Sequence, residues 1–173
     1  MPMIDLYCPE GALEPEARAE AVEKLTAALL RHEGADETNQ YVRAMAWTLV
    51  HELPAHAINV DGRPAERPMY RVLVTVPAGT LLQGPGPVGT QARRNLVREV
   101  TEILLAAEGG EYSPTEAGRV YCLIQEVADG YWGGLGTTFR MEDIVATATP
   151  EAPQTAISAD ARVAIEELLS VRA

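Results

Sequence analysis

The chain carries the same order of elements twice, and this repeat is the strongest constraint on its fold. Each half begins with a strand-forming apolar run, continues with a segment whose apolar residues recur at helical spacing, and ends with a second strand-forming run. The predicted segments are strands 3–8, 41–53, 69–76 and 119–127 and helices 15–32 and 89–108. Strands that alternate with helices in this way predict an α/β fold.

Residues of the two halves also match each other. Aligned without a gap, residues 46–62 and 120–136 share three identities. The identical pairs are Leu49 with Leu123, Glu52 with Glu126, and Gly62 with Gly136. Matched residues within a matched order of elements favour an internal duplication over coincidence.

A duplicated strand–helix–strand unit predicts a specific architecture. Right-handed crossovers make the two strands of each unit parallel neighbours. We therefore expect an α/β fold of two fused β-α-β units, at about residues 2–62 and 68–136, forming a four-stranded sheet with two helices on one face. The expected domain spans residues 1–144, and residues 145–173 are expected to form a linker and a short helix. The other sheet face and the open strand edges need cover, which oligomerisation provides.

Composition excludes several classes of partner. The formal net charge of −11 and the pI near 4.7 argue against nucleic-acid binding, which relies on clustered Lys and Arg. No apolar run approaches the roughly 20 residues that span a bilayer, and no basic and apolar leader opens the chain. We therefore expect a cytoplasmic protein that does not bind membranes. His32, His51 and His56 lack further ligands at metal-binding spacing, so neither a metal nor a cofactor is expected.

Pro2 directly follows the initiator methionine and opens the first apolar run. Methionine is usually trimmed when the next side chain is small, and trimming would leave Pro2 as a free secondary amine. An α-amine has an ordinary pKa of roughly 7.7–8.0, and burial lowers this pKa because it disfavours the charged form. A neutral amine near pH 7 suits general-base catalysis. Pro2 is therefore the candidate catalytic residue.

Three motifs within about residues 2–140 resemble the tautomerase superfamily. The Pro-Met-Ile at 2–4 resembles the start of macrophage migration inhibitory factor, and the run 119–127 resembles an Arg-Val-Tyr strand of the same branch. The Trp-Gly-Gly-Leu-Gly at 132–136 resembles the segment that ends the 4-oxalocrotonate tautomerase unit. The resemblance implies a homotrimer with sites near the subunit boundaries. Each site would use one N-terminal proline to move a proton in a small-molecule keto or enol acid.

The resemblance also implies roles for other residues. Tyr121 falls where a site tyrosine lies and could hydrogen-bond an enolate oxygen, and Trp132 aligns with an apolar wall of the pocket. Arg43 lies close to the position of a site lysine and is the first candidate to bind a substrate carboxylate, ahead of Arg71 and Arg119. Tyr121 and Trp132 are as compatible with packing as with these roles, and a lone arginine is often a solvated charge.

The chain departs from some branches of the superfamily. Ala12 and Trp47 stand where the 4-oxalocrotonate branch has arginines, and the run 77–80 lacks the arginine of the dehalogenase and decarboxylase branches. These differences argue against dicarboxylate isomerisation and against those two activities. We expect a cofactor-free tautomerase with Pro2 as the general base. The alternatives are a decarboxylase or hydratase that uses a cationic Pro2, and a catalytically inactive trimeric binding or scaffold protein.

Overall fold

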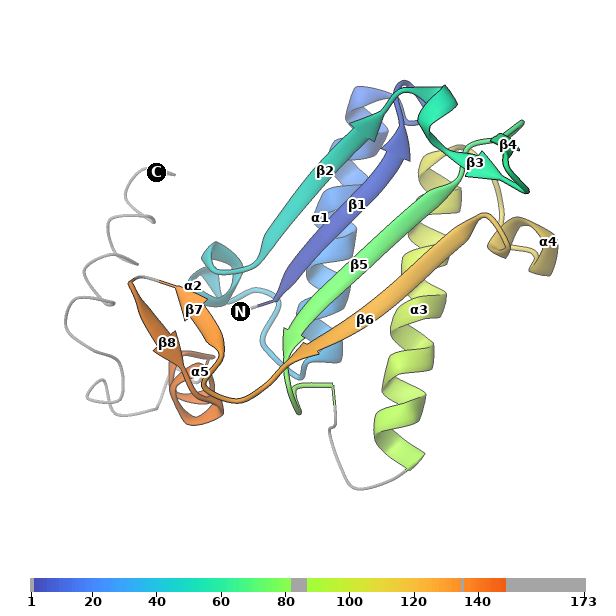
Figure 1. Ribbon diagram of the computed structural model, residues 1–173. Coiled ribbons are helices and arrows are strands. Elements are labelled where there is room, and N and C mark those ends of the chain that lie inside the picture. Colours follow the sequence, from blue (N-terminus) through green and yellow to red (C-terminus); the bar gives the residue numbers. More distant parts are fainter. Residues whose placement is uncertain (1, 82–86, 135, 149–173) are drawn as a thin grey trace.

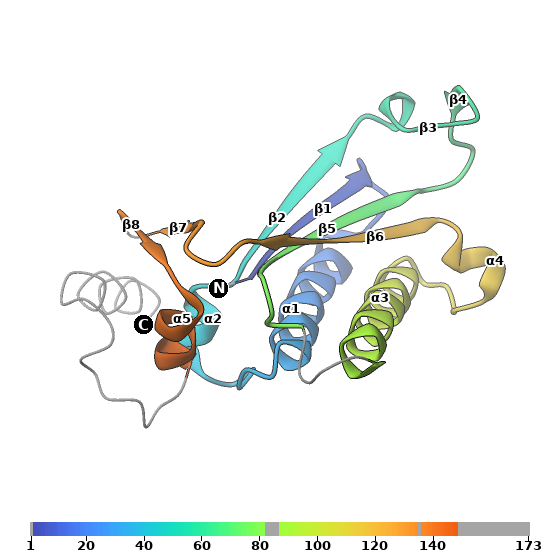
Figure 2. The same ribbon diagram turned by 60° about the horizontal axis from the view of Figure 1, so that its bottom comes forward.

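The computed structural model describes residues 2–81, 87–134 and 136–148. Its centre is one sheet whose strands are β1 (Met3–Pro9), β2 (Trp47–Leu53), β5 (Tyr70–Pro77) and β6 (Val120–Val127), in the order β2-β1-β5-β6. Helices α1 (Pro15–His32) and α3 (Pro87–Ala107) lie side by side on one face of this sheet (Figures 1 and 2). The predicted α/β fold with two helices on one face is confirmed.

Each half of the chain forms one parallel strand pair. β1 pairs with β2, and β5 pairs with β6 in the same way. The two halves join along β1 and β5, which are antiparallel, with Met3 opposite Thr75 and Tyr7 opposite Arg71. The start of β1, the end of α1 and the end of β5 therefore lie at the same end of the sheet. We call this end of the sheet the Pro2 end.

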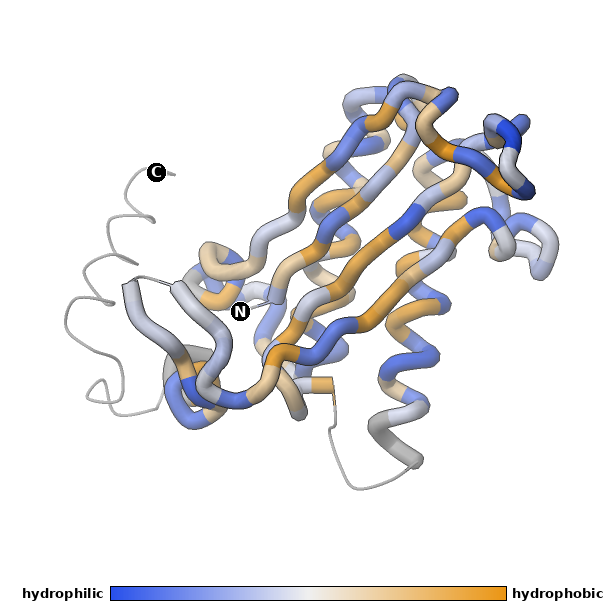
Figure 3. The backbone as a smooth tube through the Cα atoms, viewed as in Figure 1, coloured by the Kyte–Doolittle hydropathy of each residue, from blue (hydrophilic) through white to orange (hydrophobic). Residues whose placement is uncertain are grey.

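The core lies between the sheet and the two helices. Alternate residues of a strand point to opposite faces, so every second residue of β1 and β5 faces the helices. The strand residues of this core are Ile4, Leu6, Cys8, Tyr70, Val72, Val74 and Val76, and the main helical ones are Leu25, Leu29, Leu96, Val100, Leu104 and Leu105. Each apolar side chain contributes roughly 1.5–3 kcal/mol when fully buried. Figure 3 shows the resulting hydrophobic stretches along the strands and helices.

Shorter elements connect and flank the sheet. The remaining elements are α2 (Gln40–Ala44), the 3-10 turn η1 (Ala55–Ala57), β3 (Asn59–Val60), β4 (Arg63–Pro64), α4 (Pro114–Ala117), β7 (Trp132–Gly134), β8 (Thr137–Phe139) and α5 (Met141–Ala148). β3 and β4 form one small antiparallel pair, and β7 and β8 form another. α2, β7, β8 and α5 gather beside the N-terminus (Figure 1).

The predicted strand 41–53 is wrong in its first part, because α2 occupies residues 40–44 and β2 begins only at Trp47. Local polar groups favour the helical turn. The Asn39 side chain accepts a hydrogen bond from the Val42 backbone N–H at 3.4 Å, and the Asn39 carbonyl accepts one from Arg43 N–H at 3.0 Å. Val42 and Ala44 are buried in this turn. Their apolar side chains are therefore removed from water without forming a strand.

The C-terminal boundary also differs from the expectation. α5 runs from Met141 to Ala148, so residues 145–148 are helical where a linker was expected to begin. The predicted short helix near the C-terminus lies outside the described residues.

Among the described residues, the sheet face opposite the helices is covered only at its Pro2 end, where the side chains of Met3 and Val127 pack against Trp132, Phe139 and Ile144. We call it the uncovered face (Figure 2). By strand alternation it carries Met3, Asp5, Tyr7, Trp47, Leu49, His51, Arg71, Leu73, Thr75, Tyr121 and Leu123. Several of these apolar side chains are exposed, including Trp47 at 59% and Leu123 at 46%. None of the helices that the structure describes is long and apolar enough to span a membrane.

Candidate active site

Pro2 is buried at the Pro2 end of the sheet, immediately before β1. Its carbonyl accepts a hydrogen bond from the Trp47 backbone N–H at 3.2 Å, which extends the β1–β2 ladder by one residue. The buried position supplies the low-polarity surroundings that lower the pKa of an amine.

Trp132 lies at the same end of the sheet. It is only 9% exposed and packs with Phe139 and Ile144 in a small cluster that also receives the side chain of Met3. The β7–β8 hairpin holds this cluster together, because Trp132 pairs with Phe139 across it. The structure thus brings the Trp132 cluster into contact with Met3, the residue that follows Pro2.

Glu33 is a buried carboxyl at the end of α1 that the sequence analysis does not single out. It caps the C-terminus of α1, it is 9% exposed, and its backbone N–H donates to the Leu29 carbonyl at 3.0 Å. Burial raises the pKa of its carboxyl, while the positive charge of the chain's N-terminus and a hydrogen bond with the Thr80 side chain lower it. A sequence signal was present, because Glu33 continues the buried stripe of Ala21, Leu25 and Leu29 at four-residue spacing.

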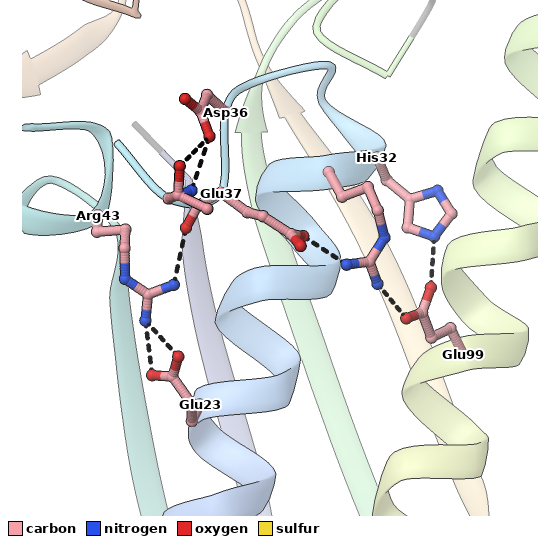
Figure 4. Close-up of polar contacts among 8 residues, drawn as sticks. Glu23, His32, Asp36, Glu37, Arg43 and Glu99 are labelled. Atoms are coloured by element: carbon pink, nitrogen blue, oxygen red, sulfur yellow. Dashed lines mark hydrogen bonds and ion pairs between the residues drawn. The ribbon is translucent and has the colours of Figure 1, made fainter. Parts of the chain in front are cut away.

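Arg43 lies on α2 and is held by acceptors from two neighbouring segments (Figure 4). One of its terminal nitrogens donates to both carboxylate oxygens of Glu23 at 2.6 Å, and the other donates to the Glu37 carbonyl at 3.0 Å. Its guanidinium is therefore paired with a carboxylate of the same chain. A substrate carboxylate would have to compete with Glu23 for this cation.

Figure 4 also shows the ion pairs that fix the neighbouring C-terminal turn of α1. Arg31 bridges Glu37 and Glu99, and the His32 ring lies 2.9 Å from the other oxygen of Glu99. These contacts tie α1 to α3 and to the loop that follows α1. They hold the segment that carries Glu33 in place.

The Arg119 side chain is held by ion pairs and a hydrogen bond within its own chain. Its side chain is 9% exposed and lies 2.7 Å from a carboxylate oxygen of Glu108 and 2.8 Å from one of Glu116. It also donates to the Pro68 carbonyl at 2.7 Å. These contacts join β6 to the segment before β5 and leave the guanidinium little room to bind a ligand.

Tyr121 projects from the uncovered face and is 66% exposed. Its register partner on β5 is Arg71, whose guanidinium lies 4.9 Å from the centre of the Tyr7 ring. The Tyr7 ring in turn stacks on His51 at 4.3 Å. These side chains, except His51, line a cavity of about 490 Å³ together with apolar residues such as Leu53 and Met69.

Within one chain, Pro2 and Tyr121 lie at opposite ends of the sheet. Tyr121 is level with Tyr7, which is five residues from Pro2, so the separation along the strands is about 16 Å at ~3.3 Å per residue. Two strand spacings add about 10 Å across the sheet. A small acid cannot touch both residues of the same chain.

Comparison with known proteins places the fold. No protein-family model matches the sequence, and no curated protein sequence matches it. Solved structures do match, and one is a member of the cis-3-chloroacrylic acid dehalogenase family, with a TM-score of 0.66 and 15% identity over 97% of this chain and 99% of that chain. A wild-type fused 4-OT described as an asymmetric trimer has a TM-score of 0.58 and 20% identity over 79% of this chain and 94% of its own.

A third match is the macrophage migration inhibitory factor-like protein from Entamoeba histolytica. Its TM-score is 0.58 and its identity 14%, over 80% of this chain and 98% of that protein. These structures belong to different branches of one superfamily and share the duplicated sheet described above. The fold of this chain is therefore the tautomerase-superfamily fold that its motifs predicted.

Proposed function

We propose that this chain is a cofactor-free tautomerase that acts on a small 2-keto or enol acid, with the Pro2 amine as the general base after removal of Met1. The observation that carries the proposal is the position of Pro2. It is buried at the start of β1, and the next residue, Met3, packs against the Trp132 cluster. The solved structures that share the fold of this chain are enzymes of one superfamily. This supports an enzyme rather than a catalytically inactive binding protein.

The chemistry needs one group that exchanges a proton with the substrate. The neutral Pro2 amine takes the proton from the enol oxygen. The resulting ammonium then gives a proton to the carbon next to the new carbonyl carbon, at the other end of the former double bond. The amine ends in the state in which it began, so no cofactor is consumed. The rate gain expected from one positioned acid–base group is typically 10²–10⁴-fold.

The proposed assembly is a homotrimer, and two observations support it. The uncovered face exposes large apolar side chains, which marks an interaction surface, and the fused 4-OT match is described as a trimer. In such an assembly the Pro2 of one copy would lie near Tyr121 of another. In this arrangement a small acid could touch Pro2 of one copy and Tyr121 of another, although the two residues of the same chain lie too far apart.

A substrate carboxylate needs a cation in the site, and an arginine matches its geometry. Arg43 was the first candidate, and it serves this role only if substrate displaces Glu23. Arg71 has no ion pair with a carboxylate among the described residues, and it shares the cavity with Tyr121. We therefore propose Arg71, approaching from the second copy, as the stronger candidate.

The alternative reaction, decarboxylation or hydration with a cationic Pro2, is favoured by one observation. The N-terminal charge acts on the Glu33 carboxyl, whose pKa it lowers, and a carboxylate stabilises a nearby ammonium. The pH dependence of kcat/KM separates the two reactions, because a base requires the neutral amine and an acid requires the charged one.

The test uses three untagged proteins and the enol of phenylpyruvate, whose ketonisation is followed by ultraviolet absorbance. In Pro2→Ala the chain still loses Met1 and carries a primary amine, whereas the large side chain of Pro2→Leu retains Met1. We expect strong activity in the natural chain, reduced activity in Pro2→Ala and none in Pro2→Leu. Equal rates in all three proteins would refute the proposed base, and no rate in any of them would favour the scaffold alternative.

A further inference from the structure

A row of four side chains crosses the uncovered face at the end of the sheet far from Pro2. Tyr7 is the register partner of His51 on one side and of Arg71 on the other, and Arg71 is the register partner of Tyr121. Neighbouring strands lie about 4.8 Å apart, so each side chain of the row can reach the next one. The row thus crosses all four strands, and three of its members line the cavity of about 490 Å³.

The Tyr7 ring is held in place by its neighbours in this row. The His51 ring stacks on it, with 4.3 Å between the ring centroids and 13° between the ring planes. His51 is itself anchored, because its Nε2 lies 2.6 Å from a carboxylate oxygen of Asp5. The Arg71 guanidinium lies over the Tyr7 ring, with its central carbon 4.9 Å from the ring centroid. An aromatic ring attracts a cation at this distance.

The charge of Arg71 is not neutralised by a carboxylate of the described residues. Asp5 is the one carboxylate among the described strand residues of the uncovered face, and it is paired with His51. Arg71 is also the only charged residue among the described residues that line the cavity, whose other side chains are mostly apolar. The cavity therefore offers one guanidinium to one carboxylate, beside apolar surface.

We infer that Tyr7 is a positioning residue for Arg71, and that its ring holds the guanidinium at the cavity, ready for the carboxylate of a ligand that also carries an apolar group. The inference rests on the proposed function, which makes Arg71 the cation for a substrate carboxylate. An arginine that is held beforehand loses less conformational freedom when it binds. An aromatic ring holds the cation without neutralising it, whereas a carboxylate such as Glu23 beside Arg43 competes with the ligand.

The test compares the binding of phenylacetate and of the neutral phenylacetamide, measured by NMR titration of ¹⁵N-labelled protein. Neither probe has a keto group that could tautomerise. Tyr7→Leu removes the ring beneath Arg71, Tyr7→Phe retains it, and Arg71→Gln removes the cation. The matched control is Tyr112→Leu, because the Tyr112 ring lies 3.6 Å from Arg98, a cation of α3 that also pairs with Glu102. Circular dichroism verifies the folding of each variant.

The deciding quantity is the ratio of the two affinities. Loss of a cavity wall weakens both probes, whereas loss of a positioned cation weakens only the acid. We expect this ratio to fall at least about 10-fold in Arg71→Gln and about 3- to 5-fold in Tyr7→Leu. Tyr7→Phe and Tyr112→Leu should retain the ratio of the natural chain.

An unchanged ratio in a folded Tyr7→Leu would overturn the inference. A natural chain that binds phenylacetate no better than phenylacetamide, or an unchanged ratio in Arg71→Gln, would refute the role of Arg71 itself and the inference with it. Neither probe needs turnover, so the result for Tyr7 is obtained even if the enol of phenylpyruvate is not converted and the proposed function fails.

The natural chain supplies a second readout, which decides the matter if Tyr7→Leu does not fold. The Tyr7 ring current shifts the Arg71 Nε–H resonance, which is identified by its loss in Arg71→Gln. We expect this resonance to respond to phenylacetate and to keep its ring-current shift in the complex. A return to the position of a free arginine side chain would overturn the inference, because the guanidinium would then leave the Tyr7 ring in order to bind.

Discussion

Replacing Leu123 by aspartate should dissociate the proposed trimer and leave the subunit folded. Leu123 lies on β6 in the uncovered face and is 46% exposed in the single chain. Full burial of a leucine is worth roughly 1.5–3 kcal/mol, so burying the remaining surface is worth about 1 kcal/mol per copy. Three copies give about 3 kcal/mol, and desolvation of three carboxylates adds to this cost. At ~1.4 kcal/mol per tenfold, association should weaken by at least about 100-fold.

The assay is sedimentation velocity over a range of protein concentrations, with circular dichroism to verify folding. The matched control is Ala19→Asp, which adds the same charge on the exposed face of α1. We expect a trimer for the natural chain and the control, and a monomer with unchanged secondary structure for Leu123→Asp. A trimer of unchanged stability in Leu123→Asp, or a natural chain that stays monomeric at all concentrations, would refute the assignment of the uncovered face.

Three further predictions concern stability. Trp132→Ala should lower the free energy of unfolding by about 3 kcal/mol in urea denaturation, because it empties a buried aromatic site; a loss below about 1 kcal/mol would contradict the packing role. Arg119→Leu should cost about 3 kcal/mol, since it leaves the carboxylate of Glu108 without its partner, and an unchanged midpoint would argue against this pairing. Burial raises the pKa of Glu33, so its carboxyl disfavours folding as the pH rises above its ordinary value near 4.5. Glu33→Gln should therefore be more stable than the natural chain between pH 5 and 7 in thermal melts. Melting temperatures that change with pH in the same way for both proteins would contradict a raised pKa of the Glu33 carboxyl.

The fold was predictable because its main signals are periodic and repeated. The helical stripes and the alternating strands follow from the spacing of apolar residues, and the repeat determines how the two halves join. α2 was not predictable from β-propensity, because hydrogen bonds to Asn39 and burial of Val42 override it locally.

The candidate site was only partly predictable. Pro2 and Trp132 come from motifs, and the structure brings them to one end of the sheet. The pairing of Arg43 with Glu23 joins residues on two different helices, and no local pattern indicates which carboxylate an arginine selects. Glu33 was overlooked because a carboxylate at a helix end usually faces solvent, and only the packed structure shows that this one is buried.

The most direct test of the central claim is the intact mass of the untagged protein. The proposed chemistry predicts the mass of a chain that begins at Pro2, with a free secondary amine in the site. A mass that retains Met1 would contradict it, because the nitrogen of Pro2 would then be an amide without basicity.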